Sequence, residues 1–155
     1  MNFKKASFYW LLVIAWMCII FLFSSKPAQQ SDTQSLFVIQ EINKLANSFG
    51  FQGELLDNNW NYFIRKSAHA WEYAVLCMLL YLAVSALGAR GKKLFLGALL
   101  VCIIYAITDE IHQAFVPGRA ARVTDVIIDT AGGFLGLIIM RILNDLWQKR
   151  RRVME

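Results

Sequence analysis

Long apolar runs alternate with short polar stretches along this chain. Four apolar stretches stand out, at residues 6–23, about 70–87, 94–108 and 123–143. A bilayer core takes about 20 helical residues, with a range of about 17–25. The first and last runs fit this length directly, whereas the middle two fit only if the polar flanks at 65–72 and 109–113 are also helical. We therefore predict four membrane-spanning helices, at about residues 6–23, 59–87, 93–113 and 123–143.

The composition also indicates an all-α integral membrane protein. Apolar residues make up 57% of the 155 positions and charged residues only 17%, which lies outside the range of soluble domains. The length suits a single membrane domain over residues 1–155. The first run follows Lys4 and Lys5, as in a signal peptide, but the 16 residues from Phe8 to Phe23 are long for one, and no cleavage pair follows cleanly. We expect this helix to be retained.

The segment between the first two predicted spans, residues 24–58, is too long to be only a connector. Five apolar residues recur in it at helical spacing, namely Leu36, Ile39, Ile42, Ala46 and Phe49. Ser31 with Gln34 predicts a capping box at the start of this helix, and Gly50 predicts its end. An amphipathic helix is therefore expected in this loop. It lies either on the membrane surface or against the mouth of the bundle.

Basic residues predict the topology. With the N-terminus in the cytoplasm, the inside segments hold 10 of the 16 basic residues and only 2 of the 11 acidic ones. Both termini are then cytoplasmic, and residues 24–58 and 109–122 face outside. Topology thus explains the net charge of +5, which requires no nucleic-acid partner. Cys18, Cys77 and Cys102 lie singly in apolar runs and have neither disulfide nor metal spacing.

Polar residues form stripes on the predicted helices. Arg65, His69 and Glu72 are spaced i, i+4, i+7 and share one helix face. Asp125 and Asp129 share a face of the last helix. The stripe of the last helix continues through small residues, which permit close approach of a neighbouring helix, at Gly132, Gly133 and Gly136. Its opposite side, which includes Leu137, is expected to face lipid.

Six polar residues are predicted to lie at matching depths. At 1.5 Å per residue from the cytoplasmic helix ends, they stand about 21–27 Å up a core of roughly 30 Å. They are His69, Glu72, Asp109, His112, Asp125 and Asp129. Ionisable residues at membrane depth usually face a protein interior or a wet cavity. We therefore predict that these residues meet in one pocket near the outer leaflet.

Three interpretations of this layer remain open. The i, i+3 pairs predict a divalent metal bound by His69, Glu72, Asp109 and His112, because such pairs build metal sites inside helix bundles. Alternatively, the histidines move protons and the carboxylates orient them. In the third interpretation, the polar layer only specifies helix packing. For the second, the candidate catalytic residues are His69, Glu72, Asp109, His112 and Asp129.

Cations near the same layer favour an anionic ligand, such as a membrane lipid or a polyprenyl phosphate. Pro117 and Gly118 predict a tight turn that places Arg119 over the pocket mouth. The candidate substrate- or anion-binding residues are Arg65, Lys66, Glu110, Gln113, Arg119 and Asp125.

The chain resembles the VanZ-like family of small bacterial membrane proteins in several motifs taken together. The matching segments are Phe23-Ser24-Ser25-Lys26-Pro27-Ala28, Arg65-Lys66-Ser67-Ala68-His69 with Glu72-Tyr73, Asp109-Glu110-Ile111-His112-Gln113-Ala114-Phe115, Pro117-Gly118-Arg119, and Asp125 with Asp129 and Gly132. The resemblance implies a multi-pass protein of the bacterial cytoplasmic membrane, with family members linked to reduced susceptibility to teicoplanin. It does not identify a reaction.

Two functions from different classes follow from the sequence. The first is an enzyme that hydrolyses or transfers a phosphate or acyl group on an anionic lipid or cell-wall lipid intermediate. The second is a non-catalytic protein that binds or transports such a lipid, or shields it from a glycopeptide. A packing protein is the third alternative. The size of the bundle is compatible with a homodimer.

Overall fold

The computed structural model describes residues 3–51 and 53–154, and these residues form five helices and no strand. The helices are α1 (Phe3–Ser24), α2 (Ala28–Ser48), α3 (Trp60–Ala86), α4 (Gly91–Gln113) and α5 (Val123–Met154). All but α2 are long and apolar enough to cross a membrane. The prediction of an all-α protein with four membrane-spanning helices and one additional helix is confirmed.

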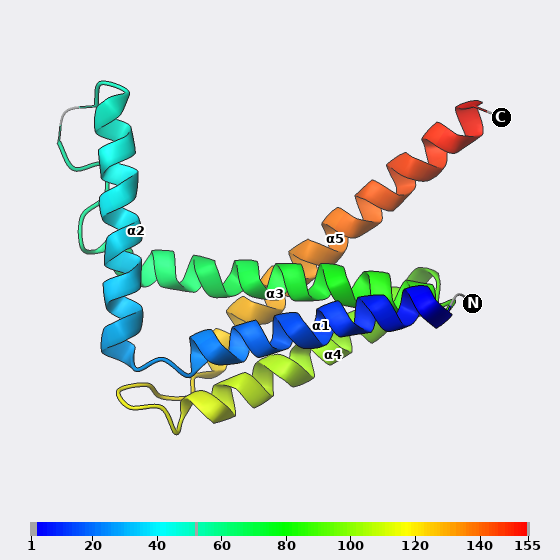
Figure 1. Ribbon diagram of the computed structural model, residues 1–155, viewed down its shortest axis with the longest axis horizontal. Coiled ribbons are helices and arrows are strands. Elements are labelled where there is room, and N and C mark those ends of the chain that lie inside the picture. Colours follow the sequence, from blue (N-terminus) through cyan, green and yellow to red (C-terminus); the bar gives the residue numbers. More distant parts are fainter. Residues whose placement is uncertain (1–2, 52, 155) are drawn as a thin grey trace.

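Figure 1 shows how the helices are arranged. α1, α3 and α4 run side by side, α5 crosses them obliquely, and α2 lies across one end of the bundle. We call this end the α2 end; both termini lie away from it. α3 is central, because it packs against each of the other four helices.

Helix bounds differ from the predicted ones mainly at the C-terminus. The other ends of the four membrane-spanning helices lie within three residues of their predicted positions, but α5 continues to Met154 instead of ending near Leu143. Residues 144–154 contain neither Gly nor Pro, so nothing in them interrupts a helix. The apolar run predicts only the part of α5 that spans the membrane. The helix itself continues into the polar residues beyond this part, because nothing there ends it.

α2 also begins earlier than predicted. Pro27 occupies the N-cap position, and no side chain caps the helix, so the capping box predicted at Ser31 is wrong. The carbonyl of Pro27 accepts hydrogen bonds from the backbone N–H groups of Gln30 and Ser31, at 3.0 and 3.1 Å. Proline fits the start of a helix because its φ is already near the helical value. The N–H group of Ala28 donates to the Pro117 carbonyl at 3.2 Å, which joins α2 to the turn between α4 and α5.

The helix α2 contacts α3 and the loop that joins these two helices. Ile39 and Ala46 are buried on one face, while Asn43 exchanges two hydrogen bonds with the backbone of Leu56, at 2.8 and 2.9 Å. Phe37 and Phe49 remain 60% and 76% exposed. The helix was expected either on the membrane surface or against the bundle, and the structure shows contact with the bundle through α3. Phe37 and Phe49 stay exposed on the rest of its surface.

The closest helix contact joins α3 and α5. A Cβ atom at Gly132 would lie 2.1 Å from the carbonyl oxygen of Ala70, and one at Gly136 would lie 2.3 Å from that of Ala74. The predicted close approach along the glycine stripe is confirmed. Leu137, which we expected to face lipid, is instead fully buried, because close packing brings more of the α5 circumference into the core.

Candidate functional site

A buried cluster of one histidine and two aspartates lies near the α2 end of the bundle. His69 on α3, Asp109 on α4 and Asp129 on α5 each offer a ligand-type atom within 4.8 Å of the other two. Asp109 is 3% exposed and Asp129 is 1% exposed, and 15% of the His69 side chain remains exposed. Helices α3, α4 and α5 thus each contribute one ionisable side chain to the same cluster.

Small residues beside the cluster make this convergence possible. Gly132 lies three residues after Asp129 and abuts Ala70, the neighbour of His69. Ala106 lies three residues before Asp109 and is fully buried in the core. Because Gly132 and Ala106 let the helix backbones approach closely, short aspartate side chains from α4 and α5 come near the imidazole on α3.

A chain of hydrogen bonds supports one oxygen of Asp109. Its Oδ2 accepts from the Ser24 hydroxyl at 2.8 Å and from Gln113 Nε2 at 3.0 Å. The amide oxygen of Gln113 accepts in turn from Arg119 at 3.0 Å. This network fixes the Asp109 carboxylate and connects it to the guanidinium group of the turn between α4 and α5.

Other carboxylate oxygens in the cluster have no protein partner. Among the described residues, Asp109 Oδ1, Asp129 Oδ2 and Glu72 Oε2 are buried without a hydrogen bond. A buried polar atom without a partner costs about 1–3 kcal/mol, and more if it is charged. Such atoms are rare in native structures, and an ion, a ligand or ordered water is among the usual reasons for them.

Glu72 and His69 lie next to each other on α3. Glu72 Oε2 is 3.8 Å from His69 Nδ1, which is an electrostatic contact and is longer than a hydrogen bond. The backbone carbonyl of Glu72 accepts from Trp16 Nε1 at 2.9 Å. The Tyr105 hydroxyl donates to the Met17 carbonyl at 2.6 Å. α1 is therefore joined to α3 and to α4 close to the cluster.

A polar pocket of about 210 Å³ opens beside this cluster at the α2 end. Four cationic side chains and two carboxylates line it, together with His69, Gln113 and small residues of the adjoining segments. The charged lining residues are Arg65, Lys66, Arg119, Arg122, Asp32 and Asp125. His69 belongs both to this pocket and to the buried cluster. A larger cavity of about 580 Å³, lined by Phe95, Phe134 and Arg141 among others, contains none of these residues.

Three of the four cations of the pocket are engaged with protein groups, and one of these, Arg119, donates to Gln113. Arg65 forms an ion pair with Asp32 of α2, and Lys66 forms one with Asp125 of α5. Burial of the Arg119 guanidinium, followed by repulsion from Arg65, lowers the pKa of Arg119 from its ordinary value. Four cationic side chains and only two carboxylates line the pocket, so an anion is the ligand that it would bind most favourably.

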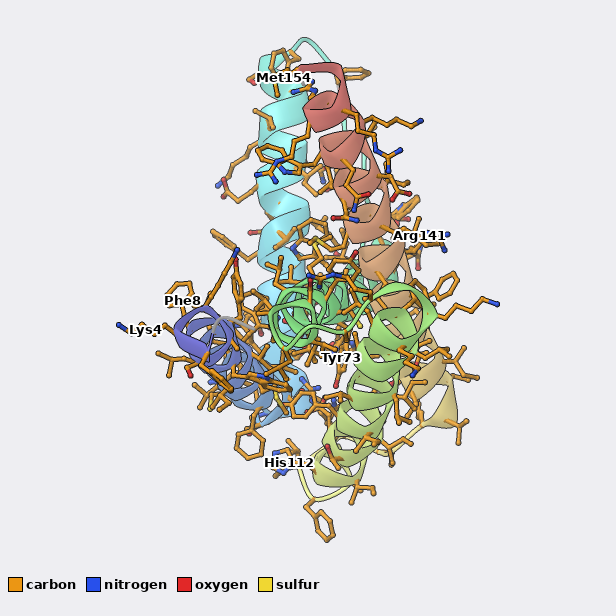
Figure 2. The ribbon with its side chains drawn as sticks, turned by 90° about the vertical axis from the view of Figure 1, so that its right-hand side faces the viewer. Lys4, Phe8, Tyr73, His112, Arg141 and Met154 are labelled. Atoms are coloured by element: carbon orange, nitrogen blue, oxygen red, sulfur yellow. The ribbon has the colours of Figure 1, made fainter. Side chains whose placement is uncertain are left out.

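His112 and Glu110 lie apart from the cluster. His112 Nε2 is 3.0 Å from the Ser25 hydroxyl, and its ring centroid is 4.3 Å from that of Phe21. Figure 2 places His112 at the end of α4 and Tyr73 in the interior of the bundle. The buried Glu110 carboxylate accepts the backbone N–H of Arg122 at 2.9 Å, which ties down the turn between α4 and α5. The structure therefore does not bring His112 together with His69, and Glu110 does not line the pocket.

The turn before Arg119 has the predicted form. The Arg119 N–H donates to the Val116 carbonyl at 3.0 Å, and Gly118 has a φ of 75°. Pro117 at the second position and Gly118 at the third are typical of a type II turn. Four contributing residues were not predicted from the sequence, namely Trp16, Ser24, Asp32 and Tyr105. Ser24 falls in a segment that already carried the family resemblance, which is the one signal that pointed toward it.

A family model described as VanZ/LLP1 matches residues 8–144 of this chain. This range includes every residue of the cluster and of the pocket lining. Neither the curated proteins nor the solved structures contain a match. The match assigns the chain to this family, but it identifies neither a ligand nor a reaction.

Proposed function

We propose that this chain, which belongs to the VanZ/LLP1 family, is a membrane protein that acts on an anionic lipid or a cell-wall lipid intermediate. The observation that carries this proposal is the position of His69. It lies between a cation-lined pocket, suited to a phosphate or carboxylate, and a buried pair of aspartates with unpartnered oxygens. A group held by the cations would therefore be presented to a residue suited to proton transfer.

The leading reaction is hydrolysis or transfer at a phosphate or acyl group. Arg65, Lys66 and Arg119 would bind the anionic headgroup, since guanidinium and ammonium groups are the usual partners of phosphate. Binding would exchange an internal carboxylate partner of Arg65 or Lys66 for the ligand. His69 would move the proton, and Glu72 would orient its imidazole. His112 has no role in this scheme, because it contacts α1 instead.

Non-catalytic binding of the same lipid is the second candidate. The lining of the pocket, among the described residues, includes no serine, threonine or cysteine that would serve as a nucleophile. Catalysis would therefore depend on an activated water, on an acceptor group of a second substrate, or on a histidine or carboxylate nucleophile. A protein without that step would sequester or move the lipid. Either activity on a cell-wall lipid intermediate offers a route to the altered teicoplanin susceptibility that the family resemblance suggested.

The proposed location is the outer leaflet of the bacterial cytoplasmic membrane, with both termini in the cytoplasm. Ten of the 16 basic residues, among them Lys149–Arg152, lie toward the ends of the helices that are remote from the α2 end. Positive residues are retained on the cytoplasmic side. The α2 end, with its pocket, would then face outward.

The test is lipid binding by purified protein in nanodiscs of phosphatidylcholine that contain either phosphatidylglycerol or undecaprenyl phosphate. We expect a preference for one of these anionic lipids over phosphatidylcholine alone. Replacing Arg119 by Gln should reduce it by about 10–100-fold, the equivalent of one charge-assisted hydrogen bond of about 1.5–3 kcal/mol. Lys92→Ala, which removes a cation from the larger cavity, is the matched control. Equal loss in both variants, or no anionic preference, would contradict the proposal.

A further inference from the structure

We infer that His69, Asp109 and Asp129 bind a divalent transition metal, Zn²⁺ or Mn²⁺, next to the anion pocket. The three residues supply one imidazole and two carboxylates from three different helices. Imidazole suits zinc, and carboxylate suits both zinc and manganese. Three protein ligands leave a position for water or substrate, as is typical of catalytic rather than structural metal sites.

The distances between the ligand atoms support this inference. Two ligands on a tetrahedral zinc ion, each about 2.0–2.2 Å from the metal, lie roughly 3.4 Å apart. The three atoms here lie within 4.8 Å of one another. Among the described residues no hydrogen bond holds the His69 or Asp129 side chain, so small rotations of these two would close such a difference without movement of the helices.

The charge balance of the cluster is an independent reason to expect a cation. Asp109 and Asp129 are each more than nine-tenths buried, and each has one oxygen without a partner. Among the described residues, no lysine or arginine forms an ion pair with either of them. Lys66, which lies nearby, pairs with Asp125 instead. Two neighbouring buried carboxylates repel each other unless one is protonated or a cation lies between them.

Glu72 lies behind His69, 3.8 Å from its Nδ1, and would support the imidazole once metal binding brought the two into hydrogen-bond range. His69 Nδ1 faces Glu72, which leaves Nε2 as the nitrogen for the metal. A carboxylate behind a ligating histidine is the usual arrangement around protein-bound metals, and its loss commonly lowers metal affinity by about 10–100-fold. Asp109 is likewise held from behind, because Ser24 and Gln113 donate to its second oxygen.

This metal would deepen the proposed function, because a divalent ion next to the cations would polarise a phosphate or acyl oxygen held in the pocket. The role of the metal rests on the proposed function, whereas metal binding itself can be measured independently of that function.

The experiment is elemental analysis of the untagged, detergent-purified protein after loading with Zn²⁺ or Mn²⁺ and removal of the free ion. We expect about one metal per chain in the wild type, an at least tenfold loss in His69→Ala and Asp129→Asn, and weaker retention in Glu72→Gln. His112→Ala is the matched control, because it removes the other histidine of the chain without removing a ligand. Thermal unfolding of the wild type should shift upward with Zn²⁺ or Mn²⁺ relative to chelator, which gives a readout even if a variant fails to fold.

Each outcome decides one of the two proposals. A wild type that binds no stoichiometric metal and shows no thermal shift overturns the metal site, while lipid binding that depends on Arg119 would still uphold the proposed function. Metal retained by His69→Ala also overturns the site. A metal lost in the predicted variants, in a protein without preference for anionic lipid, would uphold the site and refute the proposed function.

Discussion

Replacement of Gly132 by Ala should destabilise the bundle and open the functional site. The added Cβ would lie 2.1 Å from the Ala70 carbonyl oxygen, about 1.4 Å short of the roughly 3.5 Å at which non-bonded heavy atoms attract. The obstructing atoms all belong to the backbone of Ala70 in α3, so no side-chain rotation relieves the clash. α3 and α5 must separate by about 1 Å, and overpacking of this kind typically costs about 1–3 kcal/mol. The upper part of this range applies here.

The same separation moves Asp129 away from His69, because each lies within one turn of the contact. Loss of stability should therefore be accompanied by weaker binding of ligand or metal at the site. The assay is thermal unfolding in detergent, followed by size-exclusion chromatography, alongside nanodisc binding of anionic lipid.

Gly97→Ala on α4 is the matched control, because a Cβ at Gly97 meets nothing within 4 Å. Alanine is the better helix former by about 0.8–1.0 kcal/mol, so this variant should be at least as stable as the wild type. If Gly132→Ala were as stable as Gly97→Ala and bound lipid equally well, the close packing of α3 on α5 would not determine the geometry of the site.

Three further predictions test the site and its orientation. Asp129→Asn should leave the folded protein inserted and abolish function, since the amide keeps the size of the carboxylate but not its charge; loss of function that only follows loss of protein from the membrane would indicate a packing role. His112→Ala should keep anionic lipid binding and lower stability by about 1–3 kcal/mol, the value of one hydrogen bond and one ring contact with Phe21; a complete loss of binding, measured in nanodiscs, would place His112 in the site after all. Cysteine introduced at Asn58 should react with an impermeant reagent in intact cells, and one at Lys92 should not; the reverse pattern would invert the proposed topology.

The sequence predicts how deep a residue lies along its helix better than it predicts which neighbouring helix the side chain faces. Counting residues placed Asp109 and His112 near the same level as His69, and the structure does bring Asp109 to His69. His112 follows Asp109 by three residues, which rotates it by about 60° around α4. That rotation turns it toward Ser25 of α1. A single sequence contains no signal for which neighbour occupies that direction.

Long-range contacts explain the residues that the sequence did not indicate. The hydrogen bond between Ser24 and Asp109 joins positions 85 residues apart, and that between Trp16 and Glu72 joins positions 56 apart. Ser24 and Trp16 have no local pattern that marks them, because each lies at or within an apolar run. The glycine stripe is the exception. Its i, i+1, i+4 spacing predicts a close helix contact from one helix alone.

The position of the charges along each helix has a consequence for how the protein is made. In α4 the acidic pair Asp109 and Glu110 follows an uncharged stretch from residue 94 to 108, and in α5 Asp125 and Asp129 precede one from 130 to 140. A charged residue costs about 2.5–3.5 kcal/mol at the centre of an inserting helix and less near its ends. Each span can therefore enter the membrane alone and find its polar partners only when the helices assemble. A nascent chain truncated before α5 would then hold His69 and Asp109 without Asp129, so the site is complete only after the last helix has joined the bundle.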